Sequence, residues 1–260
     1  MRIYLVRKKH ILVGLAAVIL LLIASLLYNQ LAEHEVLKVF SYVRKELPIY
    51  SVDTEEKKIA ISFDAAWGSE KTQEILDILD QYKIKTTFFL VGFWVDKYPD
   101  KVKLIAERGH EIGNHSTTHP YMTKLSRDQM KMELKTTTEK IKALTNQDVI
   151  LFRPPYGDYN DLLIKTCREE GYYVIQWDVD SLDWKEYGSD HMVNRVINNV
   201  RPGSIVLFHN NAKYITQALP KILDKLISDG YTVVPISHLI YKENYSIDHT
   251  GRQKLNNAGS

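Results

Sequence analysis

The sequence predicts an α/β fold built on a parallel sheet. Two observations carry this prediction. From Lys57 onward, short apolar runs alternate with amphipathic helical stretches, and residues typical of helix ends stand between them. Seven strands alternating with six helices fit either an incomplete barrel or an open doubly wound sheet. The chain has 260 residues, 45% of them hydrophobic, which suits one sizeable domain plus appendages.

The predicted strands are short runs rich in apolar residues. They cover residues 58–63, 86–91, 110–113, 149–152, 173–177, 204–208 and 231–234.

The predicted helices are bounded by capping residues. Ser126 and Gln129 form a capping box before an apolar helical pattern. Pro99 suits the first turn of a helix, and glycine ends helices readily. The other boundaries are Pro99 with Gly109, Asn160 with Gly171, and Tyr214 with Gly230.

The N-terminus predicts a membrane anchor. Arg2, Arg7, Lys8 and Lys9 precede an apolar run over residues 11–28, which is just long enough to span a bilayer core. The basic flank places residues 1–10 in the cytoplasm and the rest of the chain outside. An uncleaved, single-pass signal anchor in the cell membrane is therefore expected. A cleaved signal peptide is the alternative and leads to the same compartment.

The rest of the chain divides into three predicted parts. Residues 29–56 mix charge with scattered apolar positions and are expected to form a spacer. Residues 57–241 hold the domain, and residues 242–260 are expected to form a loose polar tail. Cys167 cannot form an internal disulfide and is expected to be buried.

Composition argues against one class of partner. The formal net charge is +2, and no basic cluster occurs in the predicted domain. Nucleic acid is therefore not expected as a partner. A monomer is expected.

Polar residues follow five of the predicted strands. Because the carboxyl ends of parallel strands face one way, these residues are expected to meet at one site, as in many enzymes. They are Asp64, His115, His119, Arg153, Asp180, Asp183 and His209.

Each of these residues has a functional and a structural interpretation. His115 and His119, four residues apart, suit one metal ion, zinc above all, but such pairs also occur by chance. The loop Arg153-Pro154-Pro155-Tyr156-Gly157 holds a defined shape, or is a plain turn with an exposed arginine. Asp64 is a catalytic carboxylate or a helix cap. His209 acts in the site or is a satisfied buried histidine.

Five segments occur in the order of known family motifs: Ser62-Phe63-Asp64-Ala65, residues 115–119, residues 153–157, residues 180–184 and Leu207-Phe208-His209. Over residues 57–240 the chain resembles the polysaccharide deacetylase family, the NodB-homology domain of carbohydrate esterase family 4. The residues around the motifs most resemble those of membrane-anchored, sporulation-associated members from spore-forming Gram-positive bacteria. The resemblance implies a distorted, incomplete (β/α) barrel of about seven parallel strands.

The resemblance also implies a role for each site residue. A divalent metal, zinc first and cobalt or manganese as alternatives, is held by His115 and His119. Asp64 is the base and is oriented by Arg153. His209 is the acid and is tuned by Asp183, with Asp180 the less favoured partner. The backbone N–H of Tyr156 stabilises the oxyanion. The apolar groove is formed by Tyr156, Trp184 and Leu207.

One position departs from the family pattern. The first motif normally carries two adjacent aspartates, the second a metal ligand, and here Ala65 takes that place. Three outcomes follow: weak metal binding completed by water, a carboxylate from elsewhere, or an empty site.

Three functions follow in order of preference. The first is N-deacetylation of a cell-wall glycan, peptidoglycan above all. The second is a catalytically weak or silent glycan-binding protein of the envelope, motivated by Ala65. The third is a metal-free amidase acting on a C–N bond outside sugars.

Overall fold

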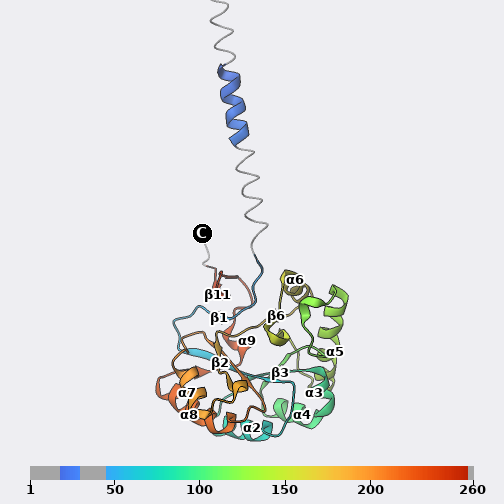
Figure 1. The fold of residues 1–260 in the computed structure, drawn as a ribbon, viewed down its shortest axis with the longest axis vertical. Coiled ribbons are helices and arrows are strands. Elements are labelled where there is room, and N and C mark those ends of the chain that lie inside the picture. Colours follow the sequence, from blue (N-terminus) through green and yellow to red (C-terminus); the bar gives the residue numbers. More distant parts are fainter. Residues whose placement is uncertain (1–17, 30–44, 257–260) are drawn as a thin grey trace, which may run out of the picture. The chain divides into compact units, whose positions relative to one another are not determined.

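The computed structural model describes residues 18–29 and 45–256 (Figure 1). The chain divides into two units, Met1–Lys45 and Glu46–Ser260. In the first unit, residues 18–29 are helical and their large apolar side chains are exposed. Within the described residues, no helix combines the length and apolar character needed to cross a bilayer. The predicted anchor begins at residue 11, so its first part, like residues 1–10, lies outside the described residues.

The second unit is built on one parallel sheet. Its strands are hydrogen-bonded in the order β6-β5-β4-β3-β2-β8-β7, with β9 also paired to β2. Every pairing in this sheet is parallel, and the sheet curls into the incomplete barrel that the resemblance implied. The strands are β2 (Lys58–Ala65), β3 (Thr87–Leu90), β4 (Glu111–Asn114), β5 (Leu151–Phe152), β6 (Tyr173–Val174), β7 (Val179–Asp180), β8 (Ile205–His209) and β9 (Thr232–Val233).

Helices connect the strands, as the alternating pattern predicted. The predicted caps are confirmed: Ser126 and Gln129 form a capping box, Asn160 caps the next helix, and Pro99 occupies a first turn. The helices are α2 (Thr72–Gln81), α3 (Gly92–Lys97), α4 (Pro99–Glu107), α5 (Arg127–Thr145), α6 (Asp161–Glu169), α7 (Ser189–Ile197), α8 (Ile215–Ser228) and α9 (Ile236–Leu239). Short 3₁₀ turns cover η1 (Met122–Lys124), η2 (Pro155–Gly157) and η3 (Asp183–Lys185).

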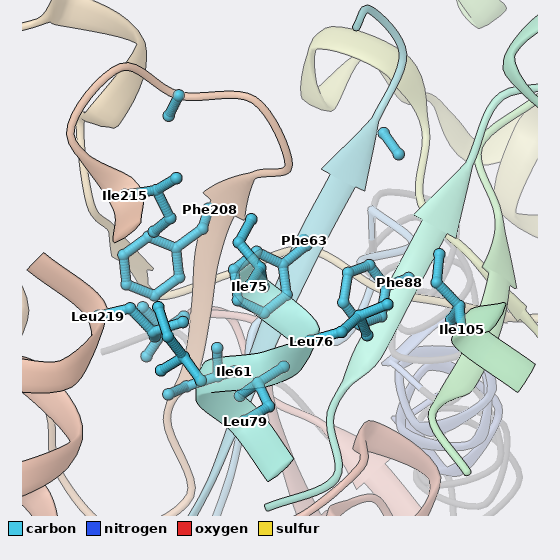
Figure 2. Packing of buried hydrophobic residues seen from close by; sticks show 14 of the residues in the cluster. Ile61, Phe63, Ile75, Leu76, Leu79, Phe88, Ile105, Phe208, Ile215 and Leu219 are labelled. Atoms are coloured by element: carbon cyan, nitrogen blue, oxygen red, sulfur yellow. The ribbon is translucent and has the colours of Figure 1, made fainter. Parts of the chain in front are cut away.

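The central strand β2 is buried on both faces, as expected for a covered parallel sheet. Phe63 stacks on Phe88 of β3 and on Phe208 of β8, with ring centroids 5.0 and 5.7 Å apart. Figure 2 shows Ile75 and Leu76 of α2 beside these rings. This packing holds the carboxyl ends of the three central strands in place, and those ends carry the site.

All seven predicted strands are present in the parallel sheet, and one more strand of this sheet, β7, was missed. It has only two residues, Val179 and Asp180. Val179 stands between two aspartates, so no run of apolar residues marks this strand. Cys167 is buried, as expected.

The expectation of a loose tail is wrong for the part of it that the structure describes. Strand β11 (Arg252–Leu255) pairs with β1 (Ser51–Val52) and β10 (Tyr245–Ile247) in a second, three-stranded sheet. The fully buried side chain of Gln253 accepts a hydrogen bond from the Tyr241 N–H at 2.8 Å and donates one to the Tyr241 carbonyl at 2.7 Å. Because both ends of this amide are satisfied, a polar segment can be buried here.

Candidate active site

The polar residues predicted to converge do so at the carboxyl edge of the sheet. Asp64, the next-to-last residue of β2, pairs with His209, the last residue of β8. On the other side, Asn114 ends β4 beside Phe152 of β5, so His115 and Arg153 follow neighbouring strands. These four side chains therefore face one region although 145 positions separate the first from the last.

A cleft of about 530 Å³ lies over this edge of the sheet. Seven of the predicted site residues line it: Asp64, His115, His119, Tyr156, Trp184, Leu207 and His209. Its other lining residues are Ala66, Trp67, Pro154, Trp177 and Asp180. Arg153 and Asp183 lie behind this lining and contact Asp64 and His209.

Asp64 is buried and paired with Arg153. Its Oδ1 accepts a hydrogen bond from Arg153 Nη1 at 2.7 Å, and its Oδ2 lies 3.5 Å from His115 Nε2. Burial raises the pKa of the Asp64 carboxyl, but Arg153, followed by His115 and His209, lowers it to a net value below the usual range. Asp64 is thus an ionised carboxylate facing the cleft, and it caps no helix.

Arg153 is fully buried, so the alternative of a turn with an exposed arginine is wrong. Its guanidinium lies over the Phe89 ring, 4.2 Å from the centroid, and donates from Nη2 to the Gln176 carbonyl at 3.2 Å. Burial lowers the pKa of this guanidinium, and the negative charge of Asp64 opposes the shift. The planar group therefore holds the carboxylate in one orientation.

His115 and His119 come together from a tight turn rather than from a helix. Ser116 and His119 both have positive φ, and the two imidazole centroids are 5.0 Å apart. His115 Nδ1 lies 2.7 Å from the Arg153 carbonyl, to which it must donate, so Nε2 carries the free lone pair. Burial lowers the pKa of His115, and burial followed by the charge of His115 lowers that of His119 to about 4.

Two residues outside the predicted site hold this turn. Asn114 donates from Nδ2 to the Leu134 carbonyl at 2.7 Å and accepts from the Ser116 N–H at 2.8 Å. Glu133 of α5 accepts from the backbone N–H groups of Thr117 and Thr118, at 2.7 and 2.8 Å. Glu133 stands within an ordinary amphipathic helical pattern, so nothing in the sequence marks it.

His209 and Asp183 form the second charged pair of the site. Asp183 is 2% exposed and accepts from both His209 Nδ1, at 2.7 Å, and the His209 backbone N–H, at 2.6 Å. Asp180 instead accepts from the Leu182 N–H. Burial lowers the pKa of His209, but the hydrogen bond and charge of Asp183 outweigh it and raise the pKa above its usual value. His209 can therefore carry a proton near neutral pH.

Aromatic side chains form the walls of the cleft. Tyr156 has a positive φ of 60° in η2, and its ring packs edge-on against His119 with centroids 4.5 Å apart. The Trp67 ring also packs edge-on against the His119 imidazole, with ring centroids 4.9 Å apart. The sequence analysis missed Trp67 and Trp177, although Trp67 stands only three positions after Asp64.

The residues present fit part of a metal site. Two neutral imidazoles, one with Nε2 free and the other with a buried Nδ1 that has no hydrogen-bond partner, suit a divalent ion. Ala65 is fully buried and belongs to the same apolar cluster as Phe63. Over residues 18–29 and 45–256, no group of three or more His, Cys, Asp or Glu side chains is placed to hold an ion together. The carboxylate from elsewhere that the sequence analysis considered is thus not found there.

An ionised carboxylate beside two neutral histidines, facing a histidine–aspartate pair in one cleft, defines a hydrolase site that activates water. Comparison with known proteins identifies the family of hydrolases to which this site belongs. The family model for polysaccharide deacetylase matches residues 51–175. A peptidoglycan-N-acetylglucosamine deacetylase of Bacillus cereus is 38% identical over 208 residues, covering 76% of this chain and 97% of the relative. The chain belongs to the polysaccharide deacetylase family, whose deacetylases are in general metal-dependent.

Other relatives include an active and an inactive kind. The peptidoglycan-N-acetylmuramic acid deacetylase PdaA of Bacillus subtilis is 32% identical and covers 78% of this chain and 79% of its own. BA3943 of Bacillus anthracis, described as a pseudoenzyme of carbohydrate esterase family 4, is 38% identical with a TM-score of 0.72, covering 74% of this chain and 68% of its own. A BA3943 mutant with restored enzymatic activity is 40% identical, with the same TM-score.

Proposed function

We propose that this chain hydrolyses N-acetyl groups from the amino sugars of peptidoglycan. The observation that carries the proposal is the pairing of opposite protonation states in one cleft. Asp64 is held ionised by Arg153, and His209 is held ready for a proton by Asp183. An amide hydrolysis that needs one base and one acid is served by such a pair.

The first half of the reaction uses the Asp64 side of the cleft. When bound by His115 and His119, a divalent ion supplies polarisation of the acetyl carbonyl and a more acidic water. Zinc suits two imidazoles best, with cobalt or manganese as alternatives. Asp64 takes a proton from the attacking water as its oxygen bonds to the carbonyl carbon. Arg153 keeps the carboxylate aimed at that water.

The second half uses the His209 side. As the C–N bond breaks, His209 gives its proton to the departing amine nitrogen, so that acetate and a free amino sugar leave. Asp183 holds the imidazole by Nδ1, which leaves Nε2 to face the cleft. The backbone N–H of Tyr156 is the proposed donor to the oxyanion. Tyr156, Trp184 and Leu207 form the groove for the acetyl methyl and the sugar face.

The proposed location is the outer side of the cell membrane. The support is the sequence: an apolar run over residues 11–28 after four basic residues. The peptidoglycan substrate and a role in sporulation are consistent with this location.

Acetate release tests the proposal. The full chain in detergent is incubated with peptidoglycan and with N-acetylglucosamine oligomers, first with chelator and then with zinc, cobalt or manganese. Metal-dependent release is expected. A folded sample that releases no acetate with any metal would rule the proposal out.

Silent glycan binding is the second candidate, favoured by Ala65 and by the similarity to the pseudoenzyme BA3943. It predicts that glycan affinity survives in Asp64→Asn while wild type releases no acetate. Loss of affinity in a folded Asp64→Asn variant would count against it. In both candidates the cleft binds glycan, so the acetate assay decides between them.

A further inference from the structure

Exposed aromatic rings continue the cleft on one side of Asp64. Tyr156 is 55% exposed and stacks on Tyr121, 48% exposed, with centroids 4.4 Å apart and planes 20° apart. Tyr121 does not line the cleft itself, so this stack extends the aromatic wall beyond it. Large apolar faces left open to water usually mark a binding surface. Sugar rings, which have apolar faces, suit such a platform.

A second group of exposed rings lies on the other side. Trp184 and Tyr187, in and after η3, are 56% and 62% exposed. Tyr156 follows β5 and Trp184 follows β7, and in the strand order these lie on opposite sides of β2, which carries Asp64. The aromatic surface therefore flanks the reacting centre on both sides, which a single sugar would not need.

A lysine stands over each aromatic group. Lys124 Nζ lies 4.7 Å from the centroid of Tyr121, and Lys185 Nζ lies 5.0 Å from that of Trp184. In the described part of the chain neither ammonium group has an ion-pair partner. Asp158 accepts hydrogen bonds from Thr123, the residue before Lys124, and Glu186, the residue after Lys185, pairs with Lys213. The cation–π contacts hold both charges beside the rings without neutralising them.

We propose that Lys124 and Lys185 select a glycan strand that bears carboxylates over a neutral strand of the same length. This inference rests on the proposed function, because it assigns a substrate class to the same cleft. A strand lying across Asp64 would stack sugars on both aromatic groups and bring its acidic substituents to the two ammonium groups. Those carboxylates belong either to lactyl ethers on the sugars or to peptide stems.

Affinity measurements test the inference without any turnover. The full chain is titrated with three glycans of matched length: a neutral N-acetylglucosamine oligomer, a peptidoglycan strand freed of its peptides, and a strand that keeps them. The variant is Lys124→Gln with Lys185→Gln. The matched control, Lys103→Gln with Lys165→Gln, removes two exposed lysines on α4 and α6, away from the cleft.

Wild type is expected to bind a carboxylate-bearing strand more tightly than the neutral oligomer. The preference should fall roughly threefold for each lysine removed from the cleft, and the control should keep it. Preference for the peptide-free strand assigns the lactyl carboxylate, and preference only for the strand with peptides assigns the stems. Equal affinity for all three glycans, or a preference unchanged in the cleft variant, would overturn the inference. Acetate release, measured separately, bears on the proposed function alone.

Discussion

On one side of the cleft, Asp64, Arg153 and His115 are almost fully buried, with side-chain exposures of 6%, 0% and 4%. On the other side, His209 keeps 34% of its side chain exposed above a completely buried Asp183. On the His209 side, Asp183 accepts hydrogen bonds from both the imidazole Nδ1 and the backbone N–H of His209. The Asp64 side is tightly built but lacks the third metal ligand at Ala65. If the proposed function is right, the groups for proton transfer are all present, and the strength of metal binding limits the rate of deacetylation.

Asp64→Asn is expected to have the largest effect on activity. The amide cannot take a proton from water, so kcat should fall by about 10² to 10⁴. Its oxygen can still accept from Arg153, but the buried guanidinium loses its counter-charge, so the melting temperature should fall as well. Acetate release and thermal unfolding are measured side by side, with the exposed Asp77→Asn as control. An unchanged rate of acetate release in the variant would show that Asp64 is not the general base.

Asp183→Asn tests the other side of the cleft. The hydrogen bond and charge of Asp183 raise the pKa of His209, so its proton persists to higher pH in the wild type. Without that charge the pKa falls, and the alkaline limb of kcat should move to lower pH with a loss of about tenfold or more. A pH–rate profile measures this. If the limb stays in place while the rate falls, Asp183 supports the fold and does not tune the acid.

Ala65→Asp should strengthen the incomplete side. Metal affinity is expected to rise roughly tenfold or more, because even outer partners of metal ligands change it about 10- to 100-fold. Without metal, the new carboxylate in an apolar cluster should lower the melting temperature, and zinc should restore it. Calorimetric titration and zinc-dependent melting measure both effects. Ala66→Asp, at the next position and in the cleft lining, is the matched control.

Equal zinc affinity in wild type and in Ala65→Asp would contradict this prediction. It would mean that the site completes its metal shell in another way or does not bind the ion at all.

His110 provides the smallest and most separate effect. It is 1% exposed, lies away from the cleft, and burial lowers its pKa to about 4. In the unfolded chain its pKa is the ordinary histidine value of 6.5, so between pH 4 and 6.5 the unfolded state binds more protons than the folded state. The contribution of neutral His110 to the free energy of unfolding is therefore present above about pH 6.5 and is lost as pH falls toward 4. The loss is about 1 kcal/mol at about pH 5.5.

His110→Asn should remove that share of the acid sensitivity and leave the pH–rate profile unchanged. Chemical unfolding at about pH 7 and pH 5.5 measures it. If wild type and variant lose equal stability on acidification, the sensitivity comes from the histidines of the cleft instead.

Much of the fold could be predicted because most of its strands lie in apolar runs and several of its helices carry caps. Ser126 and Gln129, for example, have a recognisable spacing and a single local function. The small sheet could not be predicted, since Gln253 is buried by hydrogen bonds to Tyr241, and a polar residue gives no sign of such partners. Strand β7 was missed because Val179 stands between two aspartates and no run of apolar residues marks it.

The site was predictable where a residue follows a strong strand, as Asp64 and His209 do. It was not predictable where support comes from an unrelated helix, as with Glu133, which fixes the turn before His119 through backbone N–H groups. Asp183 was preferred over Asp180 only through the family resemblance, because the contact with His209 depends on how the chain turns at Leu182, where φ is positive.

We expect the two histidines, His115 and His119, to bind metal well enough for a working site. Acetate release from peptidoglycan by the metal-free full chain, before and after zinc is added, tests it most directly, with Ala65→Asp assayed in parallel. Zinc should restore acetate release in the wild type, and Ala65→Asp should release acetate faster. If Ala65→Asp releases acetate, and the wild type is folded and binds glycan but releases none, the two histidines do not suffice. The chain would then be assigned to the silent members of its family.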